Sequence, residues 1–240
     1  MKEINRIINS AKTLVFFDLE GTQFSQEIIA IGAVKVTLDN KNNIKKTFPG
    51  FHQLVKAHGE IGSIVTKLTN IHEEDLEKDG INFYFALKKF QKYVGNLSNV
   101  KFISYGNFDI RLLQQTMKIS NLENNDFLNK IFKNYFDFTT ILNKYVKSDK
   151  NENLSLLNAL KVFQIEPVGD AHNPMYDAQN LMLLYGEFIK NKGLLLKNYL
   201  FVLQNKNFNN YSINKTIKQL FEKGSITFDE FKELVKKELE

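Results

Sequence analysis

The chain has 240 residues, of which 43% are hydrophobic, 25% charged and 12% aromatic. That is enough to bury the core of one large domain, or of an ordinary α/β domain with an appendage. It contains no cysteine, which excludes disulfides and thiolate metal sites and leaves oxygen and imidazole as metal ligands. The net charge of +5 comes almost entirely from lysine, so it is compatible with a nucleic-acid partner but does not argue for one.

The first ten residues carry charges but lack the apolar core of a signal peptide. No run of apolar residues approaches the length of a membrane span. We therefore expect a soluble, cytoplasmic protein with no membrane partner.

The first part of the chain predicts strands. Residues 13–18 (TLVFFD) form a short apolar run, which is typical of a buried central strand. Residues 28–37 (IIAIGAVKVT) are rich in β-branched side chains, and a polar turn at 39–43 separates them from a third expected strand at 48–55. Three strands joined by short connections predict an antiparallel meander.

The pattern becomes helical after this meander. Apolar residues at helical spacing predict a helix that begins after the N-cap Asn82 and ends at Gly95. A short strand at 100–105 is followed by a predicted helix at 109–118. Further helices are expected at 126–135, 139–146, 154–163 and 174–190, the last beginning with a proline. This order predicts an α/β fold, with a mixed sheet whose first three strands are antiparallel and which helices flank.

The character of the sequence changes after Gly193. Residues 213–221 and 228–239 predict two amphipathic helices, and basic and acidic residues nearly cancel there. The loop at 223–229 lacks the spaced oxygen ligands of a calcium-binding EF-hand. We expect one domain at residues 1–190 and a C-terminal helical extension at 191–240, which packs as a hairpin or contacts a protein partner.

Asp18 and Glu20 lie two residues apart at the end of the first apolar strand, so their side chains share one face. Neighbouring carboxylates repel, and burying them is costly unless a cation neutralises them. Mg²⁺ and Mn²⁺ prefer hard oxygen ligands of this kind. An Asp-x-Glu pair alone is weak evidence, since most such pairs are solvated surface charge.

Two more acids lie near predicted helix starts. Asp109 follows the strand at 100–105, and Asp177 lies near the start of the helix at 174–190. Each alone would be an ordinary acid at a helix N-terminus, favoured by the helix dipole. That interpretation does not explain His172, which lies five residues before Asp177 and outside the helix.

The order of these residues resembles the DEDDh exonucleases of the RNase H-like superfamily, a group that includes proofreading exonucleases, RNase T and oligoribonuclease. The motifs are FFDLEGT, SYGNFDIRLL and HNPMYDAQN, and the resemblance covers roughly residues 13–190 with all five positions filled. It implies an RNase H-like fold and 3′→5′ exonuclease activity. The chain is most similar to exonucleases of the KinA-pathway-inhibitor and RNAi-enhancer type, although Pro174 and Met175 depart from the usual residues between the His and the Asp.

The resemblance also implies roles for the five residues. Two Mg²⁺ or Mn²⁺ ions would lie about 4 Å apart. Asp18 would bridge them, Glu20 and Asp177 would hold the ion on the side of the attacking water, and Asp109 would help to hold the other. His172 would take a proton from that water as general base, because imidazole titrates near neutrality. The products would be 5′-mononucleotides released one at a time.

Five further residues are predicted to contact the terminal nucleotide: Gly21, Thr22, Phe24, Tyr105 and Asn107. Phe24 lies where some relatives place an aromatic that stacks on the terminal base, a contact of about 1–3 kcal/mol, although it fits equally well as a packing residue. Gly21 and Thr22 would offer backbone amides or a hydroxyl. Tyr105 and Asn107 would line the substrate groove.

The expected substrate is single-stranded RNA or short oligonucleotides, because many of the similar exonucleases act on RNA. A DNA proofreading or repair exonuclease is the first alternative, since contacts to the 2′-hydroxyl leave no short motif. The second alternative is a catalytically weak module that binds nucleic acid with the same fold; loss of an acid would indicate it, and none is lost. The sequence specifies neither processivity nor oligomeric state.

Overall fold

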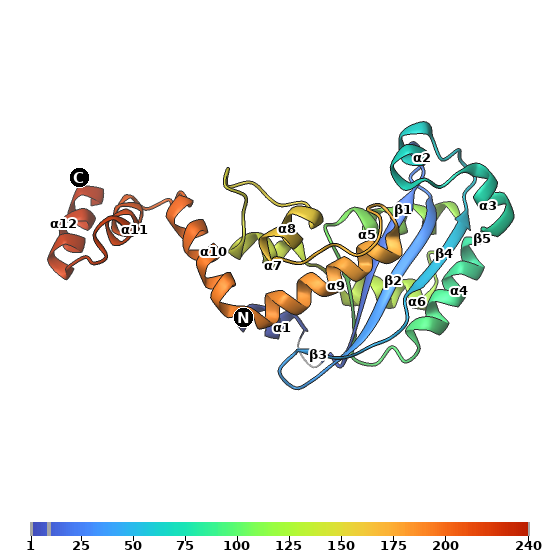
Figure 1. The fold of residues 1–240 in the computed structure, drawn as a ribbon, viewed down its shortest axis with the longest axis horizontal. Coiled ribbons are helices and arrows are strands. Elements are labelled where there is room, and N and C mark those ends of the chain that lie inside the picture. Colours follow the sequence, from blue (N-terminus) through green and yellow to red (C-terminus); the bar gives the residue numbers. More distant parts are fainter. Residues whose placement is uncertain (1, 9–10, 240) are drawn as a thin grey trace. The chain divides into compact units, whose positions relative to one another are not determined.

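The computed structural model describes residues 2–8 and 11–239 (Figure 1). They form two compact units. The first comprises Met1–Ile141 and Ser155–Lys190, and the second comprises Leu142–Leu154 and Asn191–Glu240. All residues predicted to act in catalysis belong to the first unit.

A mixed sheet forms the centre of the first unit. Its strands run in the order β5-β4-β2-β1-β6-β7, with β3 paired to β2 beside this path. The central strand β1 (Thr13–Gly21) is antiparallel to β2 (Ile28–Leu38) and parallel to β6 (Val100–Ser104). The predicted mixed sheet with an antiparallel beginning is therefore confirmed.

The third predicted strand, at 48–55, is wrong in its bounds. The chain instead forms β3 (Ile44–Thr47) and β4 (Phe51–Lys56), both antiparallel to β2. Pro49 separates them, because proline has no N–H to donate to a sheet ladder. The outermost strands, β5 (Ile81–Asn82) and β7 (Tyr135–Asp137), are parallel to β4 and β6 and were not predicted.

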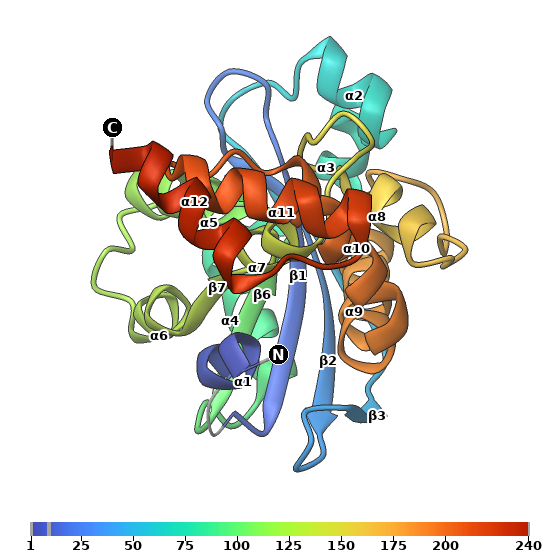
Figure 2. The ribbon, with the colours of Figure 1, turned by 90° about the vertical axis from the view of Figure 1, so that its left-hand side faces the viewer.

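Helices cover both faces of the sheet (Figure 2). On one face, α4 (Phe83–Val94), α5 (Phe108–Ile119) and α6 (Asp126–Asn134) share a core with Val15, Phe17 and Leu19 of β1. On the other face, α9 (Pro174–Lys190) packs on β1 and β2, and α8 (Leu156–Val162) packs on α9. The helix predicted at 174–190 is confirmed at both ends.

The remaining helices of the first unit are short. Three of them lie in segments where no helix was predicted: α1 (Lys2–Ile8), α2 (Ser63–Thr69) and α3 (Glu73–Asp79). The predicted start of α4 is confirmed, because the Asn82 side chain accepts the N–H of Tyr84 at 2.9 Å. The helix α7 (Thr139–Tyr145) matches the one predicted at 139–146; it belongs to the first unit up to Ile141 and to the second from Leu142.

The second unit contains α10 (Lys192–Asn205), α11 (Tyr211–Lys223) and α12 (Phe228–Leu239). The two amphipathic helices predicted after Gly193 are α11 and α12, while α10 was not predicted. Ser212 at the start of α11 donates its hydroxyl and its N–H to Glu238 near the end of α12, which joins these helices. Within the described part of the chain, no helix combines the length and apolar character needed to cross a membrane.

Candidate active site

The alternation of β1 places two acids on one face of the sheet. Leu19 points into the core below, so Asp18 and Glu20 point to the opposite face, which α9 covers. The pairing of β1 with β2 shifts between Glu20 and Gly21. The two carboxylates therefore lie next to the point where the regular pairing of β1 with β2 ends.

Asp109 reaches the same place from the first turn of α5. Its side chain is 4% exposed, and its Oδ1 accepts the N–H of Leu19 at 2.8 Å. This hydrogen bond ties the start of α5 to the strand that carries the first two acids. Asp109 is thus held close to Asp18 and Glu20 by a contact to the backbone of their own strand.

The loop before α5 is shaped by residues of β7. Gly106 has a φ of +95°, and its N–H donates to Oδ1 of Asp137 at 2.9 Å. The hydroxyl of Tyr135 donates to the Gly106 carbonyl at 2.7 Å. Sequence reasoning missed Asp137 and Tyr135 because it extended the preceding helix over the start of β7.

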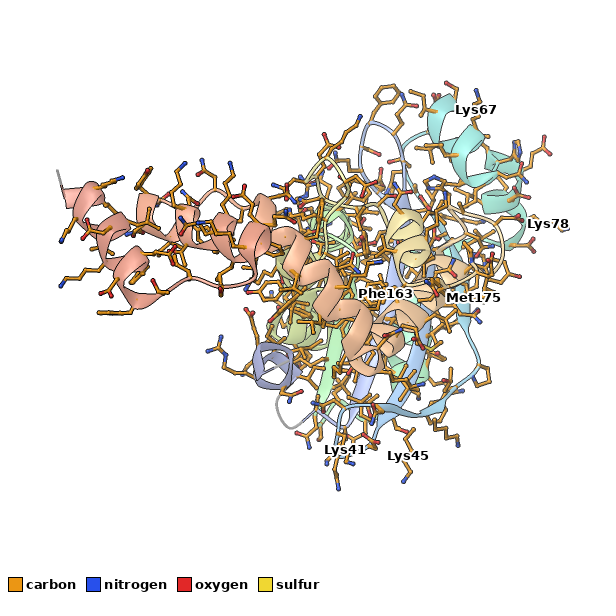
Figure 3. The ribbon with its side chains drawn as sticks, turned by 60° about the vertical axis from the view of Figure 1, so that its left-hand side comes forward. Lys41, Lys45, Lys67, Lys78, Phe163 and Met175 are labelled. Atoms are coloured by element: carbon orange, nitrogen blue, oxygen red, sulfur yellow. The ribbon has the colours of Figure 1, made fainter. Side chains whose placement is uncertain are left out.

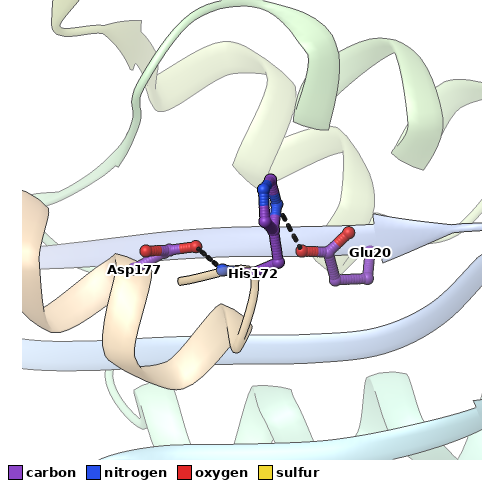
Figure 4. Close-up of side chains that lie close together, drawn as sticks. All are labelled: Glu20, His172 and Asp177. Carbon is purple, nitrogen blue, oxygen red and sulfur yellow. Dashed lines mark hydrogen bonds and ion pairs between the residues drawn. The ribbon is translucent and has the colours of Figure 1, made fainter. Parts of the chain in front are cut away.

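Asp177 and His172 come from the start of α9 and the loop before it. Oδ2 of Asp177 accepts the N–H of His172 at 2.9 Å, and Nδ1 of His172 lies 3.9 Å from Oε1 of Glu20 (Figure 4). Ligand atoms of Glu20, His172 and Asp177 all lie within 4.8 Å of one another. The φ of His172 is +63°, a conformation that non-glycine residues adopt at a cost.

A glycine lets α9 approach the acids on β1. Gly32 of β2 is the register partner of Asp18. A Cβ at Gly32 would lie 2.0 Å from the carbonyl carbon of Pro174 and 2.2 Å from the nitrogen of Met175. The first turn of α9 therefore rests directly on the β2 backbone, with Met175 beside the sheet (Figure 3). Any other residue at position 32 would push Asp177 away from Asp18.

The four carboxyl groups resist ionisation together. Burial, and then the charges of Asp109, Glu20 and Asp177, raise the pKa of Asp18 well above its usual value. Burial, followed by repulsion from Asp177 and Asp109, raises the pKa of Glu20 to about 8. Burial raises the pKa of Asp109 to about 7 and also raises that of Asp177, which the N–H of His172 partly offsets.

This donor set fits a divalent cation. Its ligand atoms are carboxylate oxygens with one imidazole nearby, which suits Mg²⁺ or Mn²⁺. A cation bound among them would replace mutual repulsion by attraction and so return the carboxyl groups to their charged form.

We expect the stability of the cation-free protein to fall as the pH rises from about 4 to about 8. A carboxyl group whose folded-state pKa is raised stabilises the fold at low pH, and this contribution is lost as the pH passes through the folded-state values, about 7 for Asp109 and about 8 for Glu20. Each tenfold rise in proton affinity corresponds to about 1.4 kcal/mol. Melting temperatures measured in EDTA across this range should fall, and added Mn²⁺ should flatten the slope. A melting temperature that rises with pH in EDTA would contradict this electrostatic description.

A cavity of about 550 Å³ lies over the cluster. Asp18, Glu20, Asp109, His172 and Asp177 all line it. The structure thus brings together the five residues that the three sequence motifs single out. The volume is in the range of sites that bind small molecules or the end of a longer one.

Apolar side chains also line the cavity. They include Val65 and Leu68 of α2, Phe108 of α5, and Leu156 and Leu157 of α8. Phe108 is 47% exposed, and the Arg111 guanidinium lies 5.9 Å from its ring centre. Sequence reasoning missed this lining. For Phe108 a signal existed, because it directly precedes Asp109; α2, however, was not predicted at all.

The predicted substrate-contacting residues divide into two groups. Gly21, Thr22 and Tyr105 line the cavity, whereas Phe24 and Asn107 are not among its lining residues. The Thr22 hydroxyl accepts the N–H of Glu27 at 2.9 Å, so it shapes the connection from β1 to β2. Phe24 lies in that connection and is 80% exposed.

A buried acid holds the segment that leads to α2. The carboxylate of Glu27 accepts the N–H groups of His58 and Gly59 at 2.9 and 3.0 Å. The N–H of Gln23 donates to the carbonyl of Ile61 at 2.8 Å. These hydrogen bonds join the loop between β1 and β2 to the segment that precedes α2. The strand that carries Asp18 and Glu20 is thereby linked to a helix that supplies part of the apolar lining.

Known proteins share this sequence pattern and fold. The family model described as exonuclease (RNase T) matches residues 15–185. The crystal structure of cell-death related nuclease 4 (CRN-4) is 18% identical with a TM-score of 0.63, covering 76% of this chain and 65% of that one. The nuclease domain of 3′hExo, a DEDDh family member bound to rAMP, is 18% identical with a TM-score of 0.62, and the match covers 77% of this chain and 94% of that one.

A third similar structure is that of E. coli exonuclease I with a dT13 oligonucleotide. It is 17% identical with a TM-score of 0.57, covering 81% of this chain and 44% of that one. The chain thus spans a little under two thirds of CRN-4 and less than half of exonuclease I. No curated protein matches the chain in sequence. At these identities the solved structures show a common fold, while the family model supplies the family.

Proposed function

The chain belongs to the RNase T exonuclease family, and on that basis we propose that it is a divalent-metal-dependent 3′→5′ exonuclease that releases 5′-mononucleotides from single-stranded nucleic acid. The observation that carries the proposal is the convergence of Asp18, Glu20, Asp109, Asp177 and His172 on one cavity. Because none of these groups is missing, an active enzyme fits the chain better than a module that only binds nucleic acid.

The carboxylates on β1 and at the starts of α5 and α9 would hold the cations. Two Mg²⁺ or Mn²⁺ ions held there would activate the attacking water and stabilise negative charge on the departing 3′ oxygen. His172, whose side chain is 50% exposed and lies beside Glu20, accepts a proton from the attacking water. Asp177 contributes twice, because its carboxylate also accepts the backbone N–H of His172.

The apolar lining would hold the terminal base. Phe108 offers an exposed aromatic face, and Leu68 and Leu157, 51% and 38% exposed, offer flexible apolar contacts. Contacts of this kind tolerate every base, because each base has a stacking face. An exonuclease that removes successive nucleotides without regard to sequence requires such tolerance.

We propose RNA as the preferred substrate and DNA as the alternative. The similar 3′hExo nuclease domain is bound to rAMP, and a related structure concerns the 3′-end of histone mRNA, whereas exonuclease I is in complex with DNA oligonucleotides. Digesting matched single-stranded RNA and DNA of one sequence in the same tube tests this preference. Faster loss of the RNA supports it, and faster loss of the DNA selects the alternative.

Replacing Phe108 with alanine should raise the KM for a single-stranded oligonucleotide by about tenfold, because stacking contributes about 1–3 kcal/mol per base. Phe24 is the alternative candidate for stacking on the terminal base. Because it does not line the cavity, Phe24→Ala should change KM by less than about twofold. Phe85 on α4, 62% exposed and not among the residues that line the cavity, provides a matched control. Steady-state kinetics on one oligonucleotide would decide, and a larger effect for Phe24→Ala than for Phe108→Ala would assign the stacking to Phe24.

A further inference from the structure

A buried amide on α9 holds the loop that carries His172. Asn180 lies three residues after Asp177 and is 1% exposed. Its Oδ1 accepts the N–H of Val168 at 2.8 Å, and its Nδ2 donates to the Val168 carbonyl at 3.2 Å. One side chain therefore binds both backbone polar groups of a single loop residue.

The same amide is connected to the end of the loop. The Asn180 amide also lies near enough to Asp177 to lower the pKa of that carboxyl group, and Asp177 accepts the N–H of His172. Asn180 thus binds the loop at Val168 and lies beside Asp177, which binds the loop at His172. Both hydrogen bonds that the described residues make with this amide go to the backbone of Val168.

The loop needs such support because its backbone is strained. Gly169 and His172 have φ values of +65° and +63°. A Cβ at Gly169 would lie 2.1 Å from the ring of Tyr176, so the loop also lies directly against α9. A non-glycine residue at positive φ costs on the order of 1–3 kcal/mol and persists only where its surroundings impose it. Released from α9, the loop would relax and move His172.

The imidazole of His172 is itself weakly held. Its side chain is 50% exposed, and its nearest acidic oxygen, on Glu20, is 3.9 Å away, beyond hydrogen-bonding distance. The position of the imidazole relative to the acids is therefore set by the backbone of the loop that carries His172. That backbone is the part of the loop that Asn180 and Asp177 hold.

We propose that Asn180 is a positioning residue for His172, holding the loop so that the imidazole stays beside the carboxylate cluster; this rests on the proposed function. A buried amide that only filled space would be replaceable by an apolar side chain without effect on the reaction. Replacing an amide that positions a catalytic group would slow the reaction, since a displacement of about 1 Å in such a group can reduce a rate by about a hundredfold.

Asn180→Ala should lower kcat by about 10- to 100-fold and leave KM within about threefold, as is typical when a group that orients catalytic ligands is removed. Leu184→Ala is the matched control, because Leu184 lies one turn further along α9, is fully buried and is not among the residues that line the cavity. That substitution should lower the melting temperature at least as much and leave kcat within about threefold. Equal losses of kcat in both variants, or unchanged kcat in Asn180→Ala, would overturn the proposal.

Two further measurements separate positioning from general damage. In a His172→Ala background, Asn180→Ala should cost less than a further twofold, because the group it positions is absent; a loss as large as in the wild-type background would contradict the proposal. Amide hydrogen exchange provides a readout independent of activity. Exchange at Val168 and His172 should accelerate in Asn180→Ala but not in Leu184→Ala, and unchanged exchange would also overturn it. A wild-type protein with no nuclease activity would instead refute the proposed function, while the exchange data would still test the loop.

Discussion

Replacing Asp18 with asparagine is expected to abolish exonuclease activity, with a loss of about a thousandfold or more, and to stabilise the cation-free protein. The loss follows because Asp18 lies close enough to the three other acids to interact with each of them electrostatically, and a bound cation contributes several kcal/mol of charge stabilisation, each 1.4 kcal/mol being about tenfold in rate. The gain in stability follows because burial and three neighbouring carboxyl groups all oppose the charge of Asp18 and raise its pKa. An amide of the same shape removes that repulsion.

Thermal unfolding with and without Mn²⁺ checks both parts of this expectation. In EDTA, Asp18→Asn should melt at a higher temperature than the wild type at about pH 8, and Mn²⁺ should raise the melting temperature of the wild type but not that of Asp18→Asn. Asp79→Asn, at an exposed acid at the end of α3, provides a matched control that should behave as the wild type. Equal Mn²⁺-induced shifts in wild type and Asp18→Asn would show that the cation binds elsewhere.

Replacing His172 with alanine is expected to lower kcat by about 10²- to 10⁴-fold, the usual contribution of a general base. Cation binding should survive, so Mn²⁺ should still raise the melting temperature. Free imidazole should restore part of the lost rate, because the side chain is half exposed and its place is open to the cavity. Initial rates with and without imidazole measure this directly.

The His172 variant also decides between two roles. Ligand atoms of Glu20, His172 and Asp177 lie within 4.8 Å of one another, close enough for the imidazole to bind a cation. If His172→Ala lost the Mn²⁺-induced stabilisation as Asp18→Asn does, His172 would be a ligand and the proton acceptor would have to be another group. Retained stabilisation together with a low kcat supports the general base.

The order of the acids could be read from the sequence because each lies next to a strong local signal. Asp18 and Glu20 end an apolar strand, and Asp177 lies in the first turn of a helix whose bounds were predicted correctly. The bounds of the strand predicted at 48–55 were wrong, because Pro49 has no N–H for the sheet and the strand begins only at Phe51. A pattern of apolar residues does not reveal this.

Other features depend on tertiary contacts that leave little trace in one sequence. The closeness of α9 to β2 depends on Gly32, and no sequence pattern indicates which strand that helix will meet. The β7 strand is three residues long and owes its form to pairing with β6. In α2, Ile64 and Leu68 are more than half exposed and no residue is fully buried, so only Val65 of this helix packs against a core cluster.

The amide of Asn180 illustrates the same point for the site. A search for apolar periodicity passes over a polar residue within a helix, although a fully buried amide must be hydrogen bonded. Its partners, the backbone N–H and carbonyl of Val168, become evident only when the loop lies against α9. Residues that position catalytic groups are therefore harder to predict than the groups themselves.

The five residues would form a metal-dependent site that removes nucleotides from the 3′ end. Digestion of a 5′-labelled single-stranded oligonucleotide with Mg²⁺ or Mn²⁺ tests it most directly, with wild type and Asp18→Asn run side by side. We predict a ladder that shortens step by step from the 3′ end with the wild type, and no ladder in EDTA or with Asp18→Asn. An immediate release of the labelled 5′ nucleotide, or a ladder that persists with Asp18→Asn, would contradict the claim.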